Sequence, residues 1–242
     1  MKAVILAAGK GSRIGHLAEN TPKSMLELNE NHTLLSFNFM QLSKSGIDSV
    51  ILVTGYNSKK IEKYASDLSK KYDISVEIVY NPFWDHCNVL GSLYVSLEKI
   101  GDDFIFLHAD TLSEIDVIEG IMASKSDVCL AVDFKACGEE EMKFWLHKDK
   151  ISRITKDDIG CEAQGEFVGI AKFSRNMVNY ISEKSKEIFQ SGVLNSYMEE
   201  VLDQGLLTES IMVDYFDASL YKTIEVDFIQ DLELARIMFI ER

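Results

Sequence analysis

The pattern of hydrophobic and polar positions divides the first half of the chain into short apolar runs and longer segments of helical period. The apolar runs are typical of buried strands and lie at residues 3–8, 49–54, 76–80, 104–108 and 128–134. Between them, apolar residues at three- and four-residue spacings predict helices over residues 34–45, 58–71, 89–99 and 115–124. Because strands and helices alternate, we predict an α/β fold with a Rossmann-like, doubly wound, mostly parallel sheet.

The pattern changes after residue 134. Two short runs at residues 143–147 and 151–154 flank a polar turn in LHKDKISRI, which predicts a small hairpin inserted at approximately residues 135–165. A further strand is expected at residues 167–173, followed by a helix that Ser174 caps and that runs to residue 189. Two last helices are expected over residues 195–204 and 227–240. Since no linker or repeat interrupts the chain, we expect one domain over residues 1–242.

Composition and charge narrow the classes of partner. The chain of 242 residues has a formal net charge of -14, which argues against binding to nucleic acid or to an anionic membrane surface. No apolar stretch reaches the roughly 18 residues of a membrane span. The four cysteines form no CxxC pair and no secretory signal is recognised, so we expect a cytoplasmic protein. Apolar positions at residues 198–202 and in the last helix leave a homodimer open.

The opening stretch MKAVILAAGKGSR runs from a strand directly into glycines, where backbone N–H groups are accessible to a phosphate. The P-loop spacing GxxxxGK[ST] is absent. The dinucleotide fingerprint has Ile14 in place of its third glycine, and no acidic residue ends the second strand at VTGY. An NAD-dependent oxidoreductase is therefore disfavoured. Lys10, Arg13 and Lys23 add positive charge, which suits a polyphosphate.

The arrangement LAAGKGSR…PK resembles the signature of nucleotidyltransferases that join a nucleoside triphosphate to a sugar phosphate or a phospho-alcohol. The segments YNPFWDHCNVLGSLYVSL, FIFLHADTL, EMKFW, GEFVGIAKF and IEVDFIQDLELA are similar to the branch that uses phosphocholine, 2-aminoethylphosphonate and related acceptors. The resemblance implies a GT-A-like nucleotidyltransferase fold. It also implies a Mg²⁺-dependent cytidylyltransferase that transfers CMP from CTP to a small phosphorylated or phosphonate amine or alcohol, with release of pyrophosphate.

The resemblance also implies roles for individual residues. Lys23 and Arg13 would act on the reacting phosphates as the catalytic cations. The nucleotide-binding residues would come from the first strand, the glycine loop and the segment around residue 90: Leu6, Ala7, Ala8, Gly9, Lys10, Gly11, Ser12, Asn88, Gly91 and Ser92. Asn88 has an alternative role as the cap of the helix that follows it.

Two aspartates are the expected ligands of Mg²⁺, which prefers oxygen donors and is usually held by one or two carboxylates plus substrate phosphates. Asp110 follows a strand at the edge of the sheet where ligands bind in open α/β folds. Asp227 precedes the last helix and has an alternative role as its cap. Glu225 and Asp231 are alternative second ligands, and His108 is a weaker candidate.

The acceptor site is expected on the insertion side of the sheet. Glu166 interrupts an apolar strand in GEFVG, where a carboxylate suits an ammonium head or a sugar hydroxyl. Trp84 and Trp145 are candidates for an aromatic face against a quaternary amine, with core packing as the alternative. Lys143 and Lys156 are candidates for the acceptor phosphate, with solvated positions on the hairpin as the alternative.

Two other functions remain open from the sequence. A sugar-1-phosphate nucleotidyltransferase would use the same chemistry with a different acceptor and base. A non-catalytic nucleotide-binding regulator would keep the fold without the reaction. Because a binder has no need for Lys23, Arg13 and Asp110 together, the enzyme is the preferred interpretation.

Overall fold

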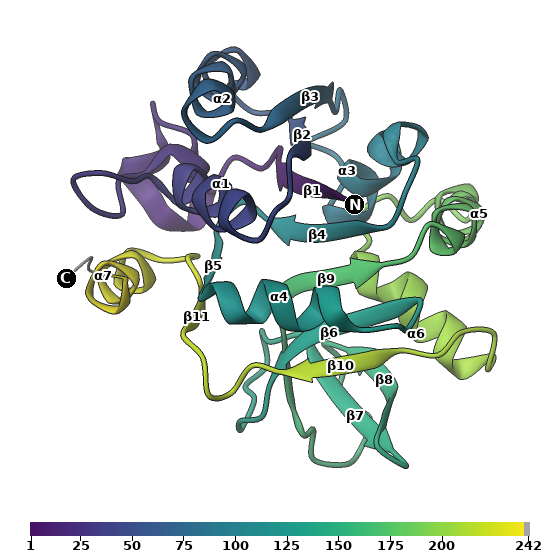
Figure 1. The fold of residues 1–242 in the computed structure, drawn as a ribbon. Coiled ribbons are helices and arrows are strands. Elements are labelled where there is room, and N and C mark those ends of the chain that lie inside the picture. Colours follow the sequence, from purple (N-terminus) through teal and green to yellow (C-terminus); the bar gives the residue numbers. More distant parts are fainter. Residues whose placement is uncertain (240–242) are drawn as a thin grey trace.

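The computed structural model describes residues 1–239, and a large twisted sheet runs through the centre of the molecule (Figure 1). Its principal strands lie in the order β10-β6-β9-β4-β1-β2-β3. Their bounds are β1 (Lys2–Ala7), β2 (Ser49–Thr54), β3 (Ser75–Tyr80), β4 (Phe104–His108), β6 (Val128–Asp133), β9 (Gly165–Phe173) and β10 (Asp214–Asp217). Neighbouring strands are parallel except at β9, which is antiparallel to both β4 and β6. The sheet is therefore mostly parallel, as predicted.

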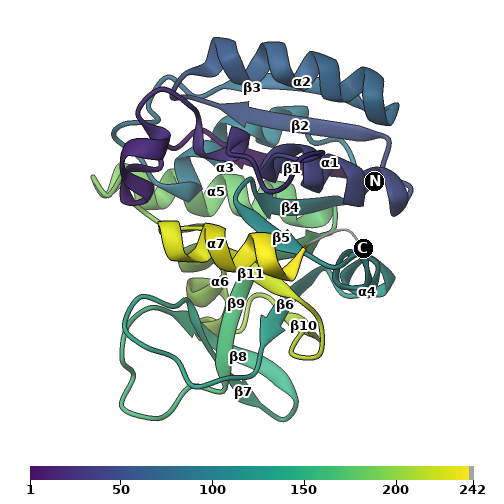
Figure 2. The ribbon, with the colours of Figure 1, turned by 90° about the vertical axis from the view of Figure 1, so that its left-hand side faces the viewer.

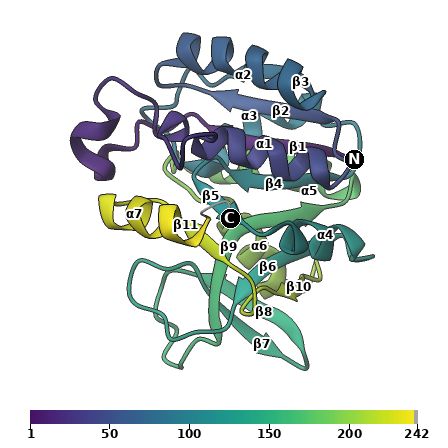
Figure 3. The same cartoon turned by 60° about the vertical axis from the view of Figure 1, so that its left-hand side comes forward.

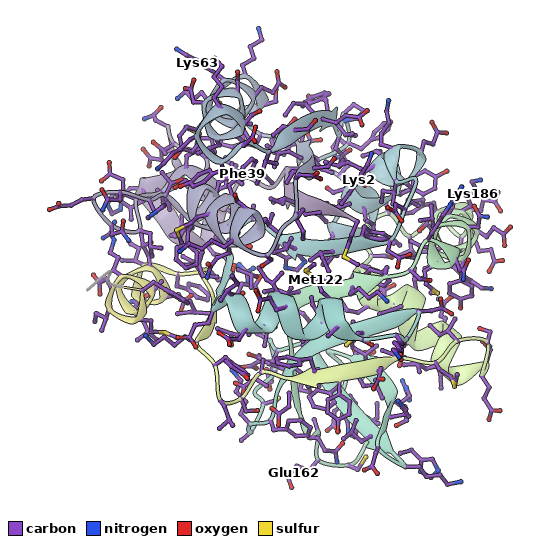
Figure 4. All side chains as sticks on the ribbon, in the orientation of Figure 1. Lys2, Phe39, Lys63, Met122, Glu162 and Lys186 are labelled. Carbon is purple, nitrogen blue, oxygen red and sulfur yellow. The ribbon has the colours of Figure 1, made fainter. Side chains whose placement is uncertain are left out.

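Helices cover both faces of this sheet, so the doubly wound arrangement is confirmed (Figure 2). One face carries α1 (Leu34–Lys44), α2 (Ser58–Tyr72) and α4 (Ile115–Ala123). The other carries α3 (Val89–Ser96), α5 (Asn176–Gln190) and α6 (Met198–Leu207). Each helix presents its apolar stripe to the sheet: Phe39 of α1 is fully buried, whereas Lys63 of α2 and Lys186 of α5 point into solvent (Figure 4). No helix within residues 1–239 has both the length and the apolar character needed to cross a bilayer.

The predicted inserted hairpin is present as β7 (Lys143–His147) and β8 (Lys150–Thr155). Strand β7 also pairs with the start of β9, where Lys143 lies opposite Glu166. The hairpin thus branches from the main sheet beside the carboxyl end of β6 (Figure 1). It places additional chain next to the strand ends at which ligands bind in open α/β sheets.

Some local features differ from the sequence-based expectations. Ser174 does not cap α5 with its side chain, because its hydroxyl bonds the carboxylate of Asp127 and Arg175 takes the capping position. The helix expected from residue 195 begins at Met198 as α6, after an irregular segment. The last helix, α7 (Ile229–Met238), ends before residue 240, which lies outside the described residues. Three short strands were not predicted: β10 at the edge of the main sheet, and β5 (Thr111–Ser113) and β11 (Thr223–Glu225), which pair with each other.

The chain after β1 does not enter an α-helix at once, as it would in a dinucleotide-binding unit. It forms two 3₁₀ segments, Ser12–Ala18 and Lys23–Met25, before α1 begins. A third apolar cluster connects this segment to α7, through Ile14, Leu112, Val226 and Leu232 among others. The first and last parts of the chain are therefore packed together.

The close packing of α4 on β10 can be tested by enlarging Gly120. A methyl group at Gly120 would lie 2.2 Å from Cε2 of Phe216. Alanine in a helix interior is ordinarily about 1 kcal/mol more favourable than glycine. Here we expect Gly120→Ala to lower the free energy of unfolding by about 1 to 3 kcal/mol, because overpacking outweighs helix propensity.

Urea unfolding followed by circular dichroism measures this change. Gly101→Ala is the matched control, since a methyl group there meets no heavy atom within 4 Å. A Gly120→Ala variant as stable as the unmodified protein would contradict the packing described.

Candidate active site

A cavity of about 900 Å³ opens at the carboxyl ends of the central strands. The loop after β1 and helix α7 project to this side of the sheet (Figure 3). The cavity is lined by the glycine loop, the ends of β4 and β6, part of β9, and the first turns of α6 and α7. It therefore joins the segments that the sequence analysis assigned to nucleotide, metal and acceptor.

The glycine loop is shaped for a close approach from the cavity. A methyl group at Gly9 would meet no heavy atom within 4 Å, so the space above this backbone is open. Gly11 has a φ of 67°, and a methyl group there would lie 2.8 Å from Cβ of Lys23. Gly11 is thus required both by the turn and by the packing of Lys23 beneath it.

Lys23 lies between two aspartates at the centre of the site. Its Nζ is 2.6 Å from Oδ2 of Asp110 and 2.8 Å from Oδ1 of Asp227. Arg13 adds a contact of 2.9 Å from Nη2 to the other oxygen of Asp227. Burial lowers the pKa of Lys23, but the two carboxylates outweigh it and raise that pKa above its usual range. Burial likewise acts against ionisation of Asp110, whose pKa is nevertheless held low by Lys23 and His108.

The pairing of β5 with β11 explains how two aspartates so distant in sequence meet. Asp110 directly precedes β5, and Thr111 lies opposite Glu225 at the end of β11. The ladder is continued by a hydrogen bond of 3.0 Å from the Val226 N–H to the Asp110 carbonyl oxygen. Asp227 is the next residue, so the short ladder brings both carboxylates to Lys23.

Helix α7 is capped by Asp231 and not by Asp227. The N–H groups of Asp227 and Phe228 donate to Oδ2 of Asp231 at 2.9 and 2.7 Å. A carboxylate at this position in the first turn is a common partner for such free N–H groups. The geometry therefore favours a capping role for Asp231 over the metal-binding role expected as an alternative, and the Asp227 carboxylate remains directed at Lys23 and Arg13.

His108 and Glu225 lie close to Asp110. Nδ1 of His108 is 3.5 Å from Oε1 of Glu225, and these residues and Asp110 each have a potential ligand atom within 4.8 Å of the others. Burial lowers the pKa of His108, but Glu225 outweighs it and the pKa rises to about 9. The carboxylate oxygens of Asp110, Asp227 and Glu225 are the donors that Mg²⁺ prefers, so the residues present fit this ion.

The residues expected around the nucleobase lie on the α3 side of the cavity. Asn88 and Ser92 line it, together with Ala7 and Ala8. The Asn88 side chain accepts a hydrogen bond of 2.9 Å from the Val89 N–H and so caps α3. Gly91 is not one of the described residues that line the cavity. A methyl group at Gly91 would lie 2.5 Å from Sγ of Cys87. Its small size serves the packing of Cys87 on α3.

Lys10 and Trp84 lie beside the same end of the cavity. The Lys10 ammonium is 5.8 Å from the centre of the Tyr56 ring, and Lys10 is outside the cavity lining formed by residues 1–239. Trp84 lines the cavity and packs on Tyr56, with ring centres 5.5 Å apart. A methyl group at Gly55 would meet both Trp84 and the Ala8 carbonyl oxygen. Trp84 therefore lies next to the strand that carries the glycine loop.

The residues expected to bind the acceptor separate into two groups. Glu166 and Lys156 line the cavity. Lys143 and Trp145 are not part of its lining within the described chain. The Lys143 ammonium bonds the carbonyl oxygens of Lys156 and Glu139, and the buried Trp145 indole donates to the Cys161 carbonyl oxygen at 3.1 Å. These two side chains stabilise the hairpin and its following loop.

Lys135 and Glu199 are among the cavity residues that were not identified from the sequence. Lys135 pairs with Glu166 at 2.6 Å, and burial raises the pKa of Glu166 in spite of this partner. Lys135 lies just after the end of β6. This position could have indicated a cavity residue, because ligands bind at the carboxyl ends of such strands. Glu199 lines the cavity from the first turn of α6 and is 3% exposed. In sequence it resembles any acidic residue at a helix start, so no signal distinguished it.

Known proteins resemble this chain in sequence and in fold. The sequence profile of the MobA-like NTP transferase domain matches residues 3–157. A CTP:phosphoglutamine cytidylyltransferase from Campylobacter jejuni is 22% identical over 261 residues, covering 97% of this chain and 98% of that protein. A choline-phosphate cytidylyltransferase from Haemophilus influenzae is 32% identical over 191 residues, covering 77% and 75% of the two chains.

A solved structure shares the whole fold. The inositol-1-phosphate CTP transferase from T. maritima superposes with a TM-score of 0.80 at 19% identity, covering 98% of this chain and 94% of that one. Nucleotidyltransferases for sugar phosphates are also among the related proteins.

The cap of α7 provides a test of how the second aspartate is positioned. We expect Asp231→Ala to lower the free energy of unfolding by about 1 kcal/mol, because two N–H groups lose their acceptor. Asp231→Asn retains an acceptor oxygen and should remain close to the unmodified protein in urea unfolding. Equal stability of the alanine and asparagine variants would contradict the capping role.

Proposed function

We propose that this chain, which belongs to the family of MobA-like NTP transferase domains, is a nucleotidyltransferase that transfers CMP from CTP to a small phosphorylated or phosphonate amine or alcohol. The single observation that carries the proposal is the cluster of Lys23, Asp110 and Asp227 beside the open glycine loop. The choice of CTP is supported by the names of relatives that cover most of this chain.

The proposed reaction brings two anions together. An acceptor phosphate or phosphonate oxygen forms a bond to the α-phosphorus of CTP, the bond from that phosphorus to the oxygen bridging to the β-phosphate breaks, and pyrophosphate leaves. Such a reaction depends on cations at fixed positions more than on a covalent nucleophile. Lys23 and Arg13 supply two of these cations, and the backbone at Gly9 and Gly11 leaves room for the triphosphate.

Asp110 and Asp227 are the residues that would hold Mg²⁺, with Glu225 close to Asp110. When bound, the ion neutralises phosphate charge as the leaving group develops. Asp110 and Asp227 would pair with the ion in place of Lys23. Lys23 then becomes available to the reacting phosphate, which is the role we assign to its buried ammonium.

Two alternatives differ from this proposal in testable ways. A sugar-1-phosphate nucleotidyltransferase would use the same cations with another acceptor. A non-catalytic regulator would bind nucleotide without turnover, yet it gives no reason to keep a buried lysine between two aspartates. Burying such charges is costly unless they are paired, and here every member of the cluster is one that the reaction uses.

Pyrophosphate release in the presence of Mg²⁺ is the experiment that tests the function. Each of the four nucleoside triphosphates is combined with phosphocholine, phosphoethanolamine, 2-aminoethylphosphonate, inositol phosphate, glycerol phosphate and a sugar 1-phosphate. We expect release with CTP and a small phosphorylated or phosphonate amine or alcohol. Release only with a sugar 1-phosphate would replace the acceptor assignment, and CTP binding without release from any pair would favour the regulator.

The metal assignment predicts the effect of one conservative change. Asp110→Asn keeps side-chain volume but weakens binding of Mg²⁺ and removes a charge from Lys23, so turnover should fall about 100-fold or more. Initial rates at saturating CTP measure the loss, and circular dichroism checks the fold. Asp116→Asn, at an exposed position on α4, is the matched control. Near-normal turnover of Asp110→Asn would reject Asp110 as a ligand.

A further inference from the structure

Glu199 is the most unusual charged side chain in the cavity. It is 3% exposed, and its Oε2 is fully buried without a hydrogen-bond partner among the described residues. Glu199 nevertheless belongs to the lining of the cavity. Burial raises the pKa of Glu199 above its usual range. Only the backbone N–H of Glu199 itself favours the charged form by hydrogen bonding, and Oε2 has no donor among the described residues, so a ligand that enters the cavity can supply one.

The groups that face Glu199 do not supply that donor. His108, Lys156 and Glu225 are near enough to act on its charge, with the first two favouring ionisation and the third opposing it. His108 approaches Glu225 through Nδ1, and its own Nε2 is also without a partner among the described residues. The Lys156 ammonium lies 4.9 Å from the centre of the Tyr197 ring. Glu199 is thus surrounded by charge but bonded by none of these side chains.

The charge of the whole cavity favours a cation. Carboxylates outnumber Lys and Arg side chains by nine to four among the described residues that line it. A triphosphate and an anionic acceptor both add negative charge, and the proposed Mg²⁺ offsets only part of it. An acceptor with a positive charge at the end away from its phosphate compensates the excess of carboxylates in the cavity, whereas a neutral sugar or polyol does not.

The kind of cation that binds depends on whether aromatic faces or carboxylate oxygens are available to contact it. Two of the cavity's aromatic rings already lie against cations: Tyr197 against Lys156, and Phe228 against Arg13 at 5.8 Å. Trp84 packs against Tyr56. A quaternary amine, which has no N–H group, binds mainly through open aromatic faces. An unpartnered carboxylate oxygen instead receives an N–H donor.

We infer that the acceptor carries a primary ammonium group and that Glu199 binds it, so that the enzyme prefers aminoalkyl phosphates or phosphonates over their trimethylated forms. This inference rests on the proposed function and specifies its acceptor. Glu166 also lines the cavity, but its carboxylate is already paired with Lys135. Glu199 is therefore the residue that distinguishes between acceptors.

The test compares three acceptors of the unmodified protein with CTP and Mg²⁺: phosphoethanolamine, phosphocholine and ethyl phosphate, which lacks the amine. We expect kcat/KM for phosphoethanolamine to exceed those for the other two by roughly tenfold or more, since an unpaired buried carboxylate penalises an acceptor without N–H donors. Equal or better use of phosphocholine or ethyl phosphate overturns the inference and leaves the proposed function intact. No pyrophosphate release from CTP with any phosphorylated or phosphonate acceptor overturns the proposed function itself.

A Glu199→Gln variant adds a second readout. We expect kcat/KM for phosphoethanolamine to fall roughly 10- to 100-fold, as for loss of a charged hydrogen bond, so that its advantage over ethyl phosphate is lost. The matched control is Glu200→Gln, the next residue of α6, whose side chain accepts from the Tyr197 N–H and whose amide oxygen can still do so. An equal loss with all three acceptors would show a structural role for Glu199 and contradict the inference.

The melting temperature separates folding from binding. Removing an unpaired buried charge does not destabilise a protein in the way that breaking a pair does, so Glu199→Gln should melt no lower than the unmodified protein. A lower melting temperature together with loss of all activity would show that Glu199 has a partner within the fold, which contradicts its assignment as a free acceptor.

Discussion

The ion pairs of Lys23 with Asp110 and Asp227 are the interaction on which the site depends. A lysine that is mostly buried would be costly on its own, and so would two aspartates placed side by side. Together the three charges compensate one another, and Arg13 extends the compensation at the open side. The arrangement holds the two proposed metal ligands and the lysine proposed to contact phosphate in one place.

Much of the architecture outside the main sheet serves this cluster. Strands β5 and β11 bring the ends of two distant segments together, and the third apolar cluster packs α7 against the chain that follows β1. Asp231 caps α7 and leaves Asp227 directed at Lys23 and Arg13. Beyond the cluster, further carboxylates line the cavity from the segment before β7 (Glu140 and Glu141), from β9 (Glu166) and from α6 (Glu199). Nucleotide and acceptor are thus expected at two ends of one cavity, with the charges between them.

The sequence predicted most strands of the central sheet, because long apolar runs and helical periods are local signals, but it missed the edge strand β10. It did not predict β5 and β11, whose three-residue strands exist only through pairing with each other. In the site, LAAGKGSR…PK and the acidic motifs indicated Lys23, Asp110 and Asp227, which the structure brings together. Lys143 and Trp145 lie on strand β7, where no comparable motif indicated their roles. Their side chains bond backbone carbonyl oxygens and stabilise the hairpin.

Glu199 shows where sequence reasoning ends. Its chemistry depends on burial and on an Oε2 atom that has no hydrogen-bond partner within residues 1–239, and neither is encoded in neighbouring residues. Asn88 shows the reverse case, in which capping and base recognition use the same residue type; the structure shows the cap directly.

The most direct measurement is a crystal structure with Mg²⁺ and a CTP analogue whose α,β-bridging oxygen is replaced by a methylene group. The account predicts a metal ion about 2.1 Å from carboxylate oxygens of Asp110 and Asp227, with the Lys23 ammonium moved to the α-phosphate. A nucleotide bound elsewhere, or Lys23 still paired with both aspartates beside an occupied glycine loop, would contradict it.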